Sequence, residues 1–296
     1  MNRKAAFCFS FLFLVLPVSI SPAAGKDKEP WKDLFLQVGD IKIHYLEAGS
    51  GDRILVFIPG WTMPAEVWRE QIPYFSSRGF RVLAIDPRSQ GLTTKTEVGN
   101  TYQQQAADLH AFLQSLKIEH SYLVGWASGV TALLEYVSSP EALKPEKMVF
   151  VDGNPAALKS DDYPGAMTAQ QARKLLLDGF EEDRAKATDR YVRSMFKSRP
   201  SESLIKELTE ESLRTPIGAA VSLYFDLFTG DRRSALMRVA VPCLVLTTSE
   251  SRAMGEYLKS KIQRADLETI EEAGTAMFLD KPQAFNQALE SFLGEH

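Results

Sequence analysis

The chain has 296 residues, of which 45% are hydrophobic and 24% are charged, so it can bury one large core and is neither disordered nor a coiled coil. Lys and Arg number 34 against 38 Asp and Glu, which makes the chain mildly acidic. Because no basic stripe that could follow a phosphate backbone is visible, we expect no nucleic acid among its partners.

Residues 1–23 have the layout of a secretory signal peptide. Arg3 and Lys4 precede an apolar run over residues 5–16, and the small residues Ser21 and Ala23 follow. The apolar run is shorter than the roughly 20 residues that a membrane span needs. We therefore predict cleavage after Ala23, no integral membrane span in the mature chain, and a periplasmic or secreted protein.

The segments that follow predict a sheet. Residues 34–38 and 41–49 alternate apolar and polar positions around a Gly-Asp pair, which indicates an antiparallel hairpin at a sheet edge. Later apolar runs are almost unbroken, as expected of parallel strands that are buried on both faces. These runs are residues 54–59, 81–86, 121–125, 147–152 and 243–248.

Helical patterns lie between these runs, which predicts an α/β fold with a mostly parallel, doubly wound sheet. We expect helices at residues 65–76, 102–116, 128–137, 254–262 and 282–292. The interval 158–235 is charged and amphipathic and has no convincing strand. We predict that it is an inserted helical cap, and that residues 33–157 and 236–296 form the core domain.

Neither cysteines nor histidines indicate a metal site or another cofactor. Cys8 would leave with the signal peptide, and Cys243 would be the only thiol, buried in an apolar run. The four histidines, at positions 44, 110, 120 and 296, are scattered along the chain.

Four motifs in order along the chain resemble those of the α/β-hydrolase superfamily, which includes serine esterases, lipases and haloperoxidases. They are IPGW at 58–61, DPRSQG at 86–91, YLVGWASGV at 122–130 and EEAGTAMFLDKPQAF at 271–285. The resemblance covers essentially everything after residue 33 and implies the α/β-hydrolase fold. It also implies an oxyanion loop after the third strand, a nucleophile elbow and a last catalytic loop.

The elbow of this family normally reads G-x-S-x-G, and its middle serine attacks the substrate. In this chain the middle residue is Ala127, which has no oxygen to act as a nucleophile. Ser128 is an alternative nucleophile, but a frame centred on it would need glycines where Trp126 and Val130 stand. The resemblance makes Ser128 the first residue of a helix.

The histidine of the resembled triad is also replaced. Gly274, Asp280 and Pro282 match the family's last catalytic loop, and Thr275 occupies the histidine position. A threonine hydroxyl does not titrate near neutrality, so it cannot carry the proton of a serine. We expect the four histidines elsewhere in the chain to be structural or solvated.

The triad acid has two candidates. Asp152 follows a predicted strand and keeps the family's order of nucleophile, acid and histidine, so we favour it as the surviving member. Glu250, in the loop after residues 243–248, is the alternative, and Asp152 could also be an ordinary turn residue.

The oxyanion hole would survive these replacements, since it would use the backbone N–H groups of Trp61 and Ser128. With Trp126 beside them, these residues could line a pocket for a carbonyl or carboxylate group. Tryptophans at such positions also pack in cores, so pocket and core both remain open for them.

We therefore expect a catalytically inactive homologue, a pseudo-hydrolase that binds a small molecule with a carbonyl or carboxylate. An active esterase-like hydrolase that uses Ser128 is the second hypothesis. A cofactor-free lyase or oxygenase of the same fold is the third, and Thr275 argues against it because such relatives rely on the histidine as a base.

Overall fold

The computed structural model describes residues 30–160, 163–164, 167–174 and 183–294. The predicted signal peptide at residues 1–23 therefore lies outside the described residues. Within the described part, no helix has the length and apolar character needed to cross a membrane.

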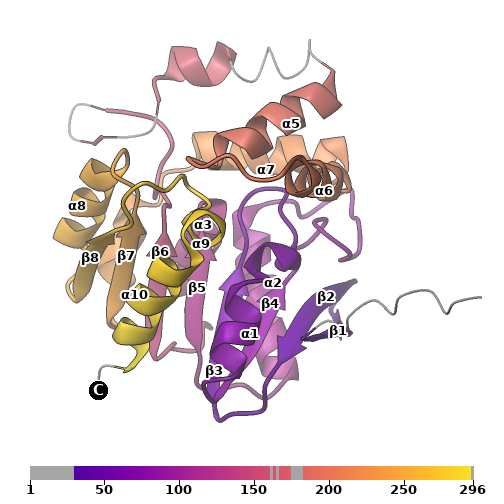
Figure 1. Cartoon of the computed structure of the whole chain (residues 1–296), viewed down its shortest axis with the longest axis vertical. Helices are drawn as coiled ribbons and strands as arrows, with labels where there is room; N and C mark the ends of the chain where they lie inside the picture. The colour runs from indigo at the N-terminus through magenta and orange to yellow at the C-terminus, as the bar shows by residue number, and fades with distance from the viewer. Residues whose placement is uncertain (1–29, 161–162, 165–166, 175–182, 295–296) are drawn as a thin grey trace, which may run out of the picture.

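The core is one eight-stranded sheet with the order β1-β2-β4-β3-β5-β6-β7-β8 (Figure 1). The pairs β1–β2 and β2–β4 are antiparallel and all other pairs are parallel, which confirms the mostly parallel sheet and the edge hairpin. The strands are β1 (Lys32–Val38), β2 (Ile41–Ala48), β3 (Arg53–Ile58), β4 (Phe80–Ile85), β5 (Tyr122–Trp126), β6 (Lys147–Val151), β7 (Cys243–Thr247) and β8 (Ala265–Thr269).

Helices cover both faces of the sheet because successive residues of a buried strand point to opposite sides. In β3, Leu55 and Phe57 belong to the hydrophobic cluster that includes α1 and α10, whereas Val56 and Ile58 belong to the one that includes α2, α3 and α8. These helices and their short neighbours are η1 (Ala65–Trp68), α1 (Gln71–Ser76), α2 (Tyr102–Ser115), α3 (Ser128–Ser138), α8 (Arg252–Lys261), α9 (Met277–Asp280) and α10 (Pro282–Gly294).

Two local expectations were incomplete. The helix expected at 65–76 is divided into η1 and α1, and the strand β8 was not expected at all. In β8 no residue is fully buried, so its sequence has no continuous apolar run of the kind that marks the central strands.

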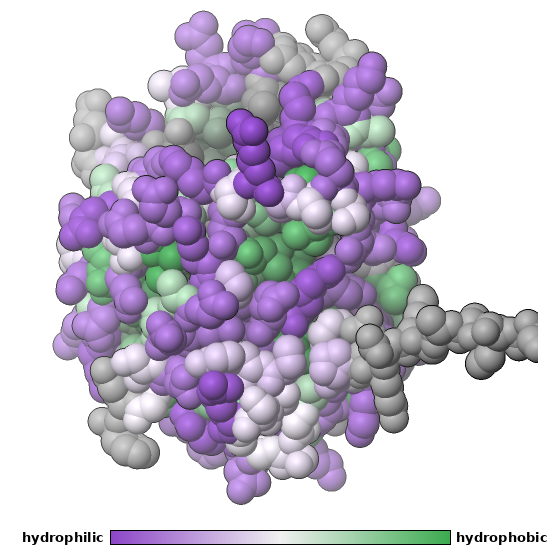
Figure 2. All heavy atoms as spheres, viewed as in Figure 1, coloured by the Kyte–Doolittle hydropathy of each residue, from purple (hydrophilic) through white to green (hydrophobic). Residues whose placement is uncertain are grey.

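Between β6 and β7 the chain forms α5 (Arg184–Ser194), α6 (Glu202–Leu213), α7 (Ile217–Thr229) and η2 (Arg233–Arg238). Figure 1 shows α5, α6 and α7 gathered as a separate layer beyond one end of the sheet, and we call these three helices the cap. The cap contacts the loop after β3, where Trp61 Nε1 donates a hydrogen bond to the Ala220 carbonyl at 2.9 Å. Most of the surface in this view is hydrophilic, with hydrophobic side chains in smaller areas (Figure 2).

Candidate functional site

The turn between β5 and α3 retains the strained backbone of a nucleophile elbow. Ala127 has φ 50° and ψ −113°, a conformation that non-glycine residues rarely adopt. Such a backbone costs about 1 to 3 kcal/mol and persists only where the surrounding structure enforces it. The turn thus presents a methyl group where the resembled family presents its nucleophile.

Glycines on either side of Ala127 allow this turn to form. A Cβ on Gly129 would lie 2.6 Å from the Ile58 carbonyl oxygen, and one on Gly125 would lie 2.8 Å from the backbone of Gly129. Contacts this short exclude any side chain, so both glycines are required for α3 to pack against β3 and β5.

A cavity of about 390 Å³ opens above Ala127, between the elbow, the loop after β3 and the cap. Its lining is mostly apolar or aromatic, as in many small-molecule sites. The lining residues are Trp61, Thr62, Ala127, Ser128, Met167, Arg184, Ala187, Thr188, Tyr191, Ser212, Ile217, Ala220, Val221, Tyr224, Leu227 and Phe228.

Three aromatic residues, Trp61, Tyr191 and Tyr224, form one wall of this cavity, and Trp61 contacts both tyrosines. Its ring lies 5.1 Å from that of Tyr191 and 5.5 Å from that of Tyr224, so both cap helices α5 and α7 pack on it. The Tyr191 hydroxyl also donates a hydrogen bond to the Trp61 carbonyl at 3.4 Å. The sequence-based expectation that Trp61 and Ser128 belong to one site agrees with their positions in the cavity lining.

Two residues of the cavity lining have backbone N–H groups without an acceptor among the described residues. Among the described residues, neither the Trp61 nor the Ser128 N–H donates a hydrogen bond. Ser128 is also the first residue of α3, where the helix dipole is positive. The pair is therefore suited to a carbonyl or carboxylate oxygen.

The Ser128 hydroxyl has no base beside it in the described structure. The Tyr102 hydroxyl lies near that of Ser128. Burial raises the pKa of Tyr102, and the interaction with Ser128 offsets only part of that rise. None of the three described histidines lines the cavity. His44 is buried against Asp86, and His120 pairs with Glu146 at the surface.

Thr275, at the expected histidine position, makes a hydrogen bond to a core residue. Its hydroxyl accepts a hydrogen bond from Trp126 Nε1 at 3.2 Å. The Trp126 ring is 1% exposed and packs edge-on against Phe278 at 4.9 Å. The assignment of Trp126 to the pocket is therefore corrected: its indole belongs to the core and does not line the cavity, because Thr275 and Phe278 hold it there.

The two acid candidates have different surroundings. Asp152 follows β6 with φ 46°, and its carboxylate accepts a hydrogen bond from the Ser251 hydroxyl. Glu250 is exposed and pairs with Lys197, which lies beyond the end of α5. The lysine lowers the pKa of Glu250. Asp152 thus lies in the sheet-end environment expected of a triad acid, whereas Glu250 faces solvent.

Asp280 has a role that the motif alone did not indicate. Its carboxylate accepts hydrogen bonds from the backbone N–H groups of Gly274 and Lys197, both at 2.7 Å. A Cβ on Gly274 would lie 2.3 Å from the Met195 carbonyl oxygen, so the last loop and the end of α5 are in close contact. Asp280 therefore connects the loop that carries Thr275 to the segment after α5, by accepting a hydrogen bond from each.

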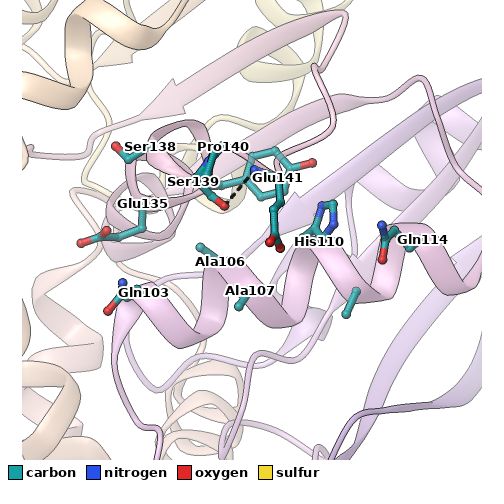
Figure 3. Close-up of a pocket in the computed structure, with 12 residues that line it drawn as sticks. Gln103, Ala106, Ala107, His110, Gln114, Glu135, Ser138, Ser139, Pro140 and Glu141 are labelled. Carbon is teal, nitrogen blue, oxygen red and sulfur yellow. Dashed lines mark hydrogen bonds between the residues drawn. The ribbon is translucent and has the colours of Figure 1, made fainter.

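A second cavity, of about 640 Å³, lies between α2 and α3 (Figure 3). His110, Glu135 and Glu141 are among its lining residues, and it shares none with the cavity above Ala127. Among the described residues, no group of three or more His, Cys, Asp or Glu side chains could hold a metal ion.

Comparison with known proteins gives one consistent result. The sequence profile of the alpha/beta hydrolase family matches residues 55–288. The AB hydrolase superfamily protein YisY of Bacillus subtilis is 24% identical over 251 residues, which covers 83% of this chain and 93% of the relative. Karrikin insensitive 2 receptor IA of Petunia hybrida is 24% identical over 262 residues, which covers 79% and 88%.

Solved structures share the same fold. An esterase from Exiguobacterium antarcticum superimposes with a TM-score of 0.83 at 24% identity, and the match covers 88% of this chain and 99% of that one.

Proposed function

Since the chain belongs to the alpha/beta hydrolase family, we propose that it is a non-catalytic member that binds a small molecule in the cavity beneath its cap. The observation that carries the proposal is Ala127, which occupies the strained elbow at the cavity lining. A methyl group cannot attack a carbonyl carbon, so no covalent acyl intermediate can form at this position.

The loss of the base supports the same conclusion independently. The hydroxyl of Thr275 is engaged by the Trp126 indole, and it cannot accept a proton near neutral pH. Members of a triad act as a unit, and the removal of one costs nearly as much activity as the removal of several. With Ala127 in one loop and Thr275 in another, the chain has neither the nucleophile nor the base of such a pair.

The features that would recognise a ligand are retained. The N–H groups of Trp61 and Ser128 can donate to a carbonyl or carboxylate oxygen, and the aromatic wall formed by Trp61, Tyr191 and Tyr224 can enclose an apolar body. Support also comes from the relative in Petunia hybrida, whose name is that of a receptor. Binding without turnover is thus compatible with membership of this family.

A fluorophosphonate probe and a fluorescence titration test the proposal together. The purified protein should remain unlabelled by the probe and should not hydrolyse p-nitrophenyl butyrate above the rate in buffer. Methyl octanoate should quench tryptophan fluorescence in a saturable way, and Trp61→Phe should reduce that signal because Trp61 lines the cavity. Stoichiometric labelling that maps to Ser128 would overturn the proposal in favour of an esterase-like enzyme.

We also propose that the chain is exported, on the basis of its first 23 residues. N-terminal sequencing of the protein from fractionated cells should give a chain that begins near Ala24. Recovery of Met1 in the mature protein would contradict export by signal cleavage.

A further inference from the structure

Arg184, the first residue of α5, lines the cavity above the elbow. Its guanidinium donates a hydrogen bond to the Thr215 carbonyl oxygen. No carboxylate among the described residues pairs with it. Arg193 on the same helix, by comparison, pairs with Asp189 and Glu202. Arg184 is thus a cation at a ligand site whose charge the described part of the protein leaves unbalanced.

The position of Arg184 is also electrostatically unfavourable for the free protein. A cation in the first turn of a helix meets the positive end of the helix dipole. Burial lowers the pKa of Arg184, the direction expected for a cation that is partly removed from water. A partly buried charge without a counter-ion is costly, and an anionic ligand would remove that cost.

A second polar group in the cavity lacks a partner. The Tyr224 hydroxyl is buried and makes no hydrogen bond within the described residues. Burial raises its pKa to about 12, so it remains a neutral donor at physiological pH. Around it the walls are apolar, with Val221, Leu227 and Phe228 among the lining residues.

We propose that the ligand is an amphipathic carboxylic acid whose carboxylate binds Arg184 while its apolar body packs against the walls contributed by α7. This inference rests on the proposed function and narrows it to a class of ligand, with the carboxylate assigned to Arg184 and not to the N–H groups of Trp61 and Ser128. A guanidinium offers paired N–H donors that match the two oxygens of a carboxylate, and such charge-assisted pairs are stronger than neutral hydrogen bonds. An ester of the same chain would lose this interaction.

Octanoate and methyl octanoate provide a matched pair of probes, because they share an apolar chain and differ in charge. In a fluorescence titration of the full chain, octanoate should bind at least about tenfold more tightly than the ester, the factor that corresponds to 1.4 kcal/mol. Arg184→Gln should weaken octanoate binding by about tenfold or more and leave methyl octanoate within about twofold. Arg184→Lys should retain part of the preference.

Lys186→Gln is the control, because Lys186 is exposed on the same helix and does not line the cavity. It removes the same charge and should leave both affinities unchanged. Circular dichroism and urea unfolding should show that Arg184→Gln is folded with a urea midpoint close to that of the original protein, because the lost hydrogen bond to the Thr215 carbonyl and the removal of an unbalanced charge have opposite effects.

Equal affinities for acid and ester, or an Arg184→Gln variant that still prefers the acid, would overturn the inference and leave the proposed function intact. Failure of both probes to bind would overturn the two together. Labelling of Ser128 by a fluorophosphonate would contradict the absence of catalysis in the proposed function, and the comparison of acid with ester would still decide the role of Arg184.

Discussion

Two turns of this protein are built in opposite ways. The turn after β4 is held by side chains: Asp86, which is fully buried, accepts hydrogen bonds from the N–H groups of Ala65 and Leu92 at 2.6 Å. His44 Nδ1 makes a third hydrogen bond to it, at 2.7 Å. The elbow after β5 is held by backbone packing and glycines, and Ala127, the N-cap residue of α3, makes no side-chain hydrogen bond to the helix.

Neighbouring residues extend the contrast. Arg88, next to the β4 turn, pairs with both Asp40 and Asp108, and a Cβ on Gly91 would collide with the Asp86 carboxylate at 2.0 Å. The turn after β4 thus depends on paired side chains, whereas the elbow presents a methyl group. The difference indicates that the elbow keeps its shape through glycine contacts, without a polar side chain at position 127.

Restoration of the missing side chains should give the largest effect. Ala127→Ser with Thr275→His should raise p-nitrophenyl ester hydrolysis at least about 10³-fold above either single variant, because nucleophile and base work only together. Asp152→Asn in this double variant should then lower the rate steeply. Glu250→Gln should have little effect, since Glu250 is exposed and paired with Lys197. A folded double variant that stays inert would refute the assignment of these positions.

Removal of the β4 turn's carboxylate should give the largest loss of stability. Asp86→Ala leaves three donors without their acceptor and should lower the free energy of unfolding by about 3 to 5 kcal/mol. Urea unfolding measures the change. Asp266→Ala, at an exposed position of β8, should stay within about 0.5 kcal/mol. If the two variants were equally stable, the side-chain network would not hold the turn.

A smaller effect is expected at the elbow, and it has the opposite sign. Ala127→Gly should raise the free energy of unfolding by about 1 kcal/mol, because glycine adopts φ 50° without strain. Ala107→Gly, at an exposed position inside α2, is the matched control and should lower it by about 1 kcal/mol. Chemical denaturation of both variants should show the two signs, and a destabilised Ala127→Gly would mean that the elbow stores no strain.

A pH dependence of stability is expected where Glu66 of η1 and His44 lie near the Asp86 carboxylate. Burial and the nearby Asp86 charge raise the pKa of Glu66 to about 7. Burial opposes protonation of His44, but its hydrogen bond to Asp86 prevails and raises the pKa of His44. The folded state therefore holds protons more tightly than the unfolded state, so stability should fall as pH rises from about 5 to about 8.

Glu66→Gln should flatten this dependence, because glutamine does not ionise, and the exposed Glu70→Gln should leave it unchanged. Urea midpoints across the pH range test both. An unaltered pH profile in Glu66→Gln would exclude Glu66 as its source.

The sequence by itself determined the family resemblance, the parallel sheet with its edge hairpin, and the presence of Ala127 and Thr275 where the resembled motifs have serine and histidine. These features depend on local rules: unbroken apolar runs, turn residues and glycine spacing. Gly125, for instance, is required by its contact with the backbone of Gly129 in the same turn. The strand β8 was not predicted from the sequence, because its partly exposed residues form no unbroken apolar run.

Only the tertiary structure decided which side chains face the cavity. Trp126 and Ala127 are adjacent in sequence, yet Trp126 packs in the core with Phe278 and Ala127 lines the cavity. Arg184 resembles any other charge of an amphipathic helix until α5, α6 and α7 are placed over the elbow. The docking of cap helices depends on contacts between residues distant in the chain, such as that between Trp61 and Ala220, and no local pattern encodes them.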